Sequence, residues 1–172
     1  MKNATTRLAD LRMSYASYLR LGLGLAAVGL SGQSALADTT WTGATNQDWN
    51  TATNWDNGLP LDAANNGAAI INTATGNFPV ISSGTSVTDF DVIVGNGAGT
   101  AGRLDHTSGT ITTGAGNWMF VGLNGGSGTY NISGDANLNA GALNISAWGG
   151  GGGTGVVNVN TSGTINLTAG QN

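Results

Sequence analysis

The single histidine of the chain, His106, directly follows Asp105, and a His–Asp pair is typical of acid–base catalysis. Both residues lie where apolar and polar residues alternate, which predicts a β-strand. Adjacent residues of a strand point to opposite faces, so the two side chains are not expected to meet. We predict a structural histidine in or near the interior.

Asp89 and Asp91 are two residues apart and would share one face of a strand. Paired carboxylates carry out glycoside hydrolysis, so a polysaccharide-degrading enzyme is one functional hypothesis. Polysaccharide hydrolases built as stacked β-strand coils need further Asp and His residues at equivalent positions of neighbouring repeats. No such residues align with Asp89 and Asp91 in this sequence. Lyase chemistry needs calcium-binding carboxylates with basic residues, which Arg103 alone does not supply. We therefore predict no catalytic residues and no enzymatic activity.

Two glycine-rich runs resemble ligand-binding loops only in composition. The run from Gly125 to Thr129 begins like a calcium-binding nonapeptide, but Tyr130 stands where an aspartate is required. The run Gly149–Gly153 lacks the Lys-Ser/Thr of a phosphate-binding loop. The sequence thus predicts no metal and no cofactor.

Three tryptophans, Trp41, Trp49 and Trp55, fall within fifteen residues. Flat indole faces stack on sugar rings, which makes a carbohydrate-binding module the second functional hypothesis. The other interpretation is an end cap, since an uncapped stack of strands exposes apolar core and unpaired backbone. The cap is the interpretation that we favour.

The element that must position these residues is a repeat between Asp91 and Asn172, with a period of about 26 residues typical of repeat architectures. Each unit carries a glycine landmark, a short apolar run before it and a Ser-Gly step after it. The landmarks are Gly102-Arg-Leu104, Gly128-Thr-Tyr130 and Gly155-Val-Val157, and the preceding runs are Ile93-Val-Gly95, Phe120-Val-Gly122 and Ile145-Ser-Ala147.

Apolar residues alternate within every unit, which indicates half-buried strands separated by glycine-rich turns. We predict an all-β fold, a right-handed parallel β-helix (β-solenoid) with coils of about 26 residues. Stacking at about 4.8 Å would place Leu104, Tyr130 and Val157 in one interior column. It would also place Asp105, Asn131 and Asn158 in one outward column, with hydrogen bonds between the amides.

Glycines after the first strand of each unit, Gly95 and Gly122, would supply corners with positive φ. Ala147 breaks this pattern in the third unit, so the sequence leaves the corner of that coil open.

Residues 1–37 have the organisation of a secretory signal peptide. Four basic residues precede an apolar run, Leu21 to Leu30, and a small-x-small site at Ala35 and Ala37 precedes Asp38. The apolar run is shorter than the roughly 20 residues of a membrane span. We predict cleavage between Ala37 and Asp38 and no transmembrane segment in the mature chain.

Removal of residues 1–37 leaves one basic residue, Arg103, against eight aspartates, hence a formal charge of −7. This charge argues against nucleic acid as a partner, because phosphates require a basic surface. The chain has no cysteine, so no disulfide braces an exported fold. Stability must come from stacked apolar columns and backbone ladders.

The opening Trp41-Thr-Gly43…Trp49…Asn54-Trp55…Gly58-Leu-Pro60, followed by the glycine-rich repeats, resembles exported bacterial β-strand-repeat proteins. Such repeats occur in autotransporter-type passengers and in proteins with a PEP-CTERM sorting tail. The resemblance implies a secreted, cell-surface or outer-membrane-associated β-helix with a structural or adhesive role. The chain shows neither a C-terminal barrel nor a Pro-Glu-Pro tail, and we expect it to be part of something longer.

The predicted organisation is a signal peptide (1–37), a Trp-rich N-terminal cap (38–67) and solenoid coils (68–172). The predicted function is structural or adhesive and non-catalytic, with extracellular glycans or neighbouring surface molecules as partners.

Overall fold

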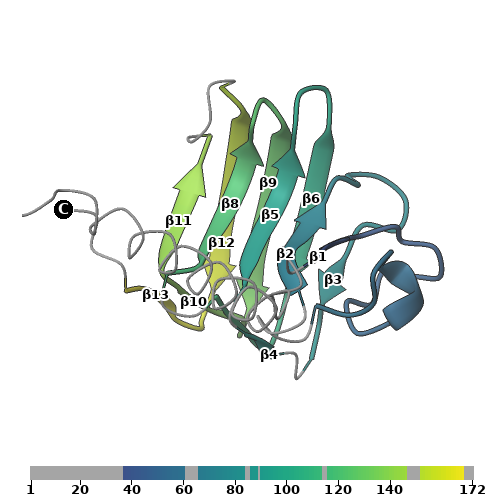
Figure 1. Cartoon of the computed structure of the whole chain (residues 1–172). Helices are drawn as coiled ribbons and strands as arrows, with labels where there is room; N and C mark the ends of the chain where they lie inside the picture. Colours follow the sequence, from purple (N-terminus) through teal and green to yellow (C-terminus); the bar gives the residue numbers. More distant parts are fainter. Residues whose placement is uncertain are drawn as a thin grey trace, which may run out of the picture. The chain divides into compact units, whose positions relative to one another are not determined.

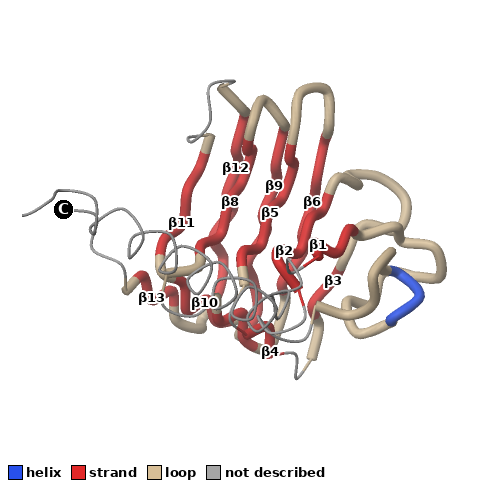
Figure 2. Tube along the Cα trace, viewed as in Figure 1, coloured by secondary structure: helices blue, strands red, loops and turns tan. Residues whose placement is uncertain are grey.

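The structure of the protein is a computed structural model that describes residues 37–60, 66–83, 86–88, 90–113, 116–146 and 152–168. The predicted signal peptide, including Ala35, lies outside these residues apart from Ala37, which with Asp38 opens strand β1 (Ala37–Thr40). No helix within the described ranges is long and apolar enough to cross a membrane. Among the described residues, one short 3₁₀-helix, η1 (Ala52–Asn54), accompanies the strands and loops (Figure 2).

Strands of the described residues form three parallel sheets that wind around a common interior (Figure 1). The five-stranded sheet has the order β1-β2-β5-β8-β11, and the two four-stranded sheets have the orders β3-β6-β9-β12 and β4-β7-β10-β13. Their bounds are β2 (Asn66–Ile71), β3 (Val80–Ile81), β4 (Ser86–Thr88), β5 (Asp91–Asn96), β6 (Ala101–His106), β7 (Thr110–Thr112), β8 (Trp118–Leu123), β9 (Ser127–Gly134), β10 (Asn137–Ala140), β11 (Ala142–Ile145), β12 (Thr154–Thr161) and β13 (Ile165–Leu167).

Each coil contributes one strand to every sheet, which makes the fold a β-solenoid, as the sequence predicts. Coil 1 comprises β2, β3 and β4, coil 2 comprises β5, β6 and β7, coil 3 comprises β8, β9 and β10, and coil 4 comprises β11, β12 and β13. Every pairing between named strands is parallel, since successive coils run in the same direction.

The predicted interior column is confirmed. Leu104 is the register partner of Tyr130, and Tyr130 is the register partner of Val157. The side chains of Leu104 and Tyr130 are fully buried, while Val157 in the last coil is partly buried. Full burial of one such side chain contributes about 1.5–3 kcal/mol, so the repeated columns hold the coils together.

The register of the last coil differs by one residue from the sequence alignment. Phe120 pairs with Asn144, and Val121 pairs with Ile145, so Ile145 does not continue the column of Ile93 and Phe120. The corner of coil 4 is therefore Ser146, which has a φ of 57°. Alignment on the glycine motif places Ala147 at the position of Gly95 and Gly122. The corner requires only a residue that tolerates positive φ, and Ser146 meets this requirement.

The five-stranded sheet is apolar on both faces. Val92 and Val94 belong to the interior cluster, whereas Ile93 between them belongs to a second cluster with Phe120. Alternation along β5 places the second cluster on the opposite face of the sheet. Trp118 packs edge-on against Phe120 there, with ring centroids 5.7 Å apart.

Candidate functional site

A row of polar side chains crosses the outward face of the sheet formed by β6, β9 and β12. Asn158 donates through Nδ2 to Oδ1 of Asn131 at 2.8 Å, and Asn131 donates through Nδ2 to Oδ1 of Asp105 at 2.6 Å. Strand register places these three residues directly over one another. The predicted amide hydrogen bonds are confirmed, and the aspartate extends them into a third coil. We call Arg103, Asp105, Asn131 and Asn158 the outer ladder.

Arg103 begins the outer ladder and neutralises its carboxylate. Its Nε and Nη2 atoms donate to the two carboxylate oxygens of Asp105 at 2.9 and 2.7 Å. Burial raises the pKa of Asp105, but hydrogen bonds from Arg103 and Asn131 outweigh it, so the pKa lies below its ordinary value. The carboxylate therefore stays ionised and paired at neutral pH.

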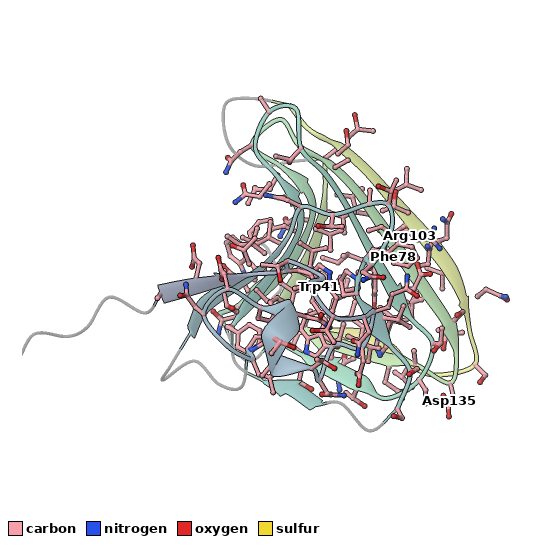
Figure 3. All side chains as sticks on the ribbon, turned by 90° about the vertical axis from the view of Figure 1, so that its right-hand side faces the viewer. Trp41, Phe78, Arg103 and Asp135 are labelled. Carbon is pink, nitrogen blue, oxygen red and sulfur yellow. The ribbon has the colours of Figure 1, made fainter. Side chains whose placement is uncertain are left out.

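The guanidinium of Arg103 also lies over the ring of Phe78, with Cζ 4.1 Å from the ring centroid (Figure 3). Phe78 comes from the coil below and immediately precedes Pro79 and β3. A cation over an aromatic face is attracted by about 0.5–1 kcal/mol at an exposed site. The spacing of residues in the sequence does not predict this contact. The ion pair of Arg103 and Asp105 could have been predicted, because residues two apart on a strand lie on the same face.

His106 lies on the opposite face of β6 from Asp105, as alternation predicts. Its ring is fully buried, and Nδ1 lies 2.9 Å from Oη of Tyr130 in the next coil. Burial lowers the pKa of His106 from 6.5 to about 4, so the ring is neutral at pH 7. Burial likewise raises the pKa of the Tyr130 hydroxyl above its ordinary value. The pair fills the interior and does not face a substrate.

The carboxylate pair proposed from the sequence is only half described, because Asp89 lies outside the described residues. Oδ1 of Asp91 accepts the backbone N–H of Trp118 at 2.7 Å, which ties coil 2 to coil 3. Burial raises the pKa of Asp91, the Trp118 hydrogen bond lowers it, and the charge of Asp38 raises it. The observed partner of Asp91 is thus the backbone of the next coil.

The three tryptophans of the N-terminal segment (residues 37–60) all belong to the interior cluster. Trp41, Trp49 and Trp55 are 2%, 2% and 4% exposed. Trp55 makes edge-on contacts with both other rings, at centroid distances of 5.1 and 4.7 Å. Figure 3 shows Trp41 inside the curve of the strands. A sugar platform needs an exposed ring face, and these rings do not present one.

Backbone pairing joins the N-terminal segment to coil 1. Trp41 N–H donates to the carbonyl of Ile70 in β2, and Trp49 N–H donates to the carbonyl of Val80 in β3. The indole Nε1 of Trp41 donates to the carbonyl of Asn77 at 2.6 Å. The segment therefore occupies strand edges that coil 1 would otherwise leave unpaired, which supports its interpretation as an end cap.

One buried amide, that of Asn54 in the opening motif Asn54-Trp55, organises the turn of this segment, a role that the motif alone does not predict. Oδ1 of Asn54 accepts the N–H groups of Thr45 and Asn46 at 2.9 and 3.2 Å. Its Nδ2 donates to Oδ1 of Asn46 and to the carbonyl of Asp48. These bonds satisfy a fully buried side chain and hold the tryptophans in place.

No group of three or more His, Asp or Glu side chains in the described part of the chain is arranged to hold a metal ion. Tyr130, at the position where a calcium nonapeptide has its aspartate, points into the core.

Comparisons with protein-family models, with curated proteins and with solved structures yield no match to this chain. The geometry of its own residues therefore carries the functional argument.

Proposed function

We propose that the chain is an exported, non-catalytic β-solenoid with a structural or adhesive role at the cell surface or outside the cell. The outer ladder is the observation that supports this proposal most. It presents amide donors and acceptors in a row, with neighbouring coils about 4.8 Å apart. The packed interior holds the strands that carry these amides in place. The Arg103–Asp105 pair keeps the row close to neutral.

Extracellular glycans are the partners that such a row suits best. Sugar hydroxyl groups hydrogen-bond to amides without requiring a charged surface, and the chain offers one cation beyond residue 37. The basic and apolar organisation of residues 1–37 supports export. Carbohydrate contact through Trp41, Trp49 and Trp55 is the alternative, and their burial does not favour it.

Titration of the purified chain against a panel of surface polysaccharides tests the proposal. We expect the double variant Asn131→Ala/Asn158→Ala to weaken binding about tenfold or more, since each lost hydrogen bond contributes about 0.5–1.5 kcal/mol. Asn139→Ala is the matched control, because Asn139 is a partly exposed asparagine on β10 of another sheet. Its affinity should equal that of the native chain.

The same titrations, followed by tryptophan emission, separate the two glycan hypotheses. Buried indoles should emit at short wavelength and stay insensitive to saturating glycan, whereas strong quenching would favour the tryptophan platform. Failure of the native chain to bind any glycan or surface molecule would contradict the adhesive role. Release of reducing sugar by the native chain, abolished in Asp91→Asn, would contradict the non-catalytic assignment.

A further inference from the structure

The ionised carboxylate of Asp105 fixes the orientation of the amides in the outer ladder. A carboxylate only accepts hydrogen bonds, so Asn131 must turn its Nδ2 toward it, as the structure shows. Oδ1 of Asn131 then faces the next coil and accepts the N–H of Asn158. A flipped Asn131 would set its oxygen against an oxygen of Asp105. The row of amides therefore has one direction, set at its first coil.

Each amide of the row keeps part of its hydrogen-bonding capacity. An asparagine side chain has two N–H donors and two lone pairs on its oxygen. Asn131 uses one N–H toward Asp105 and one lone pair toward Asn158. Among the described residues no other group bonds to this amide, and its side chain is partly exposed. One N–H and one lone pair remain, side by side, because nitrogen and oxygen are bonded to the same carbon.

A ligand that satisfies both groups must accept one hydrogen bond and donate another from neighbouring atoms. Two hydroxyl groups on adjacent carbons of a sugar ring meet this requirement, since each hydroxyl both donates and accepts. A single isolated hydroxyl group satisfies only one of the two groups well. The ligand should also be uncharged, because Arg103 already neutralises Asp105 and the chain beyond residue 37 is acidic.

The register of the strands gives the direction of the bound chain. Asn131 and Asn158 are register partners on β9 and β12, so their amides repeat at about 4.8 Å across the strands. We propose that the outer ladder binds an uncharged polysaccharide through pairs of hydroxyl groups on adjacent ring carbons, with the glycan lying across the strands along the stacking direction. This inference rests on the proposed adhesive function and specifies the ligand of the same site.

Two neutral glucans of matched length, coupled by their reducing ends to a sensor surface, test the inference. In a glucan linked through the fourth carbon, every residue keeps two hydroxyl groups on adjacent carbons. In a glucan linked through the third carbon, the internal residues keep no such pair. The native chain should bind the first glucan about tenfold or more tightly than the second, because only the first can form both hydrogen bonds at each amide.

Periodate provides a test that needs no variant. It breaks the carbon–carbon bond between adjacent hydroxyl-bearing carbons and leaves the internal residues of the second glucan intact. Treatment of the first glucan should therefore abolish its binding to the native chain.

The variant Asn131→Ala/Asn158→Ala should lose the preference and bind the two glucans equally weakly. Asn139→Ala, which changes a partly exposed asparagine of another sheet, should keep the native preference. Far-UV circular dichroism checks that both variants retain the native strand content.

Equal affinity of the native chain for the two glucans would overturn the inference. So would binding that survives periodate, or a preference that persists in Asn131→Ala/Asn158→Ala. Failure to bind either glucan would overturn it as well. The adhesive role then stands if the surface polysaccharides of the panel still bind the native chain, and falls with the inference if they do not.

Discussion

Replacing Gly95 by alanine should lower the free energy of unfolding by at least about 4 kcal/mol. Single substitutions cause losses of this size when they overpack the core or strain the backbone. Gly95 forms the corner of coil 2 with a φ of 76°. A Cβ atom there would stand 2.1 Å from the carbonyl oxygen of Ser127 and 2.9 Å from N of Gly128, both in the next coil. Because these atoms are backbone, no side chain can move aside, and the coils would have to separate. Urea denaturation followed by circular dichroism measures the loss.

Gly76→Ala is the matched control for this prediction. Gly76 has a similar φ of 69°, but a Cβ atom there meets nothing within 4 Å. It should therefore show only the cost of the left-handed conformation, about 1–2 kcal/mol. Equal losses in the two variants would contradict close stacking at the corner. Ser146 occupies the equivalent corner of coil 4 with a φ of 57°. Its side chain is tolerated there because no further coil of the described residues stacks on this corner.

Acidification should destabilise the fold through His106 by about 3 kcal/mol between pH 6.5 and pH 4. Burial holds the pKa of this ring near 4 in the folded state, against 6.5 in the unfolded chain. Above pH 6.5 the ring is neutral in both states, and the full stability is present. As the pH falls, the unfolded chain binds the proton first, so stability declines until the folded state also binds it near pH 4.

The difference between the native chain and His106→Asn isolates this effect from the aspartates. Asparagine keeps a polar group near Oη of Tyr130 but does not titrate. Its free energy of unfolding should decline less than that of the native chain between pH 6.5 and pH 4. Parallel curves for the two proteins would show that His106 is not buried as a neutral ring.

The repeat and its alternation were sufficient to predict the solenoid, the interior column at Leu104 and the hydrogen bonds at Asn131. These features depend on period and parity, which a single sequence displays directly. The register of coil 4 was wrong by one residue at Ile145. Its corner is a serine that the glycine motif does not reveal.

Contacts between the regular coils and the segments outside the repeat could not be predicted from the sequence. The stacking of Arg103 on Phe78 joins a regular coil to an irregular one, where the period no longer aligns residues. The tryptophans are buried around a turn that Asn54 holds through hydrogen bonds to Thr45 and Asp48, and no repeat or alternation in the sequence marks these partners. Tryptophan spacing alone fits both a sugar platform and a cap.

Disulfide formation between neighbouring coils tests the stacked register most directly, because the chain contains no cysteine of its own. Asn131 and Asn158 are register partners, so their Cα atoms should lie about 4.8 Å apart, within reach of a disulfide. Asn160 lies two residues further along β12, which puts its Cα beyond about 7 Å from that of Asn131. Mild oxidation should link Asn131→Cys/Asn158→Cys within one chain and leave Asn131→Cys/Asn160→Cys free. Equal linkage of the two pairs, or preference for the second, would contradict the coil register on which this account depends.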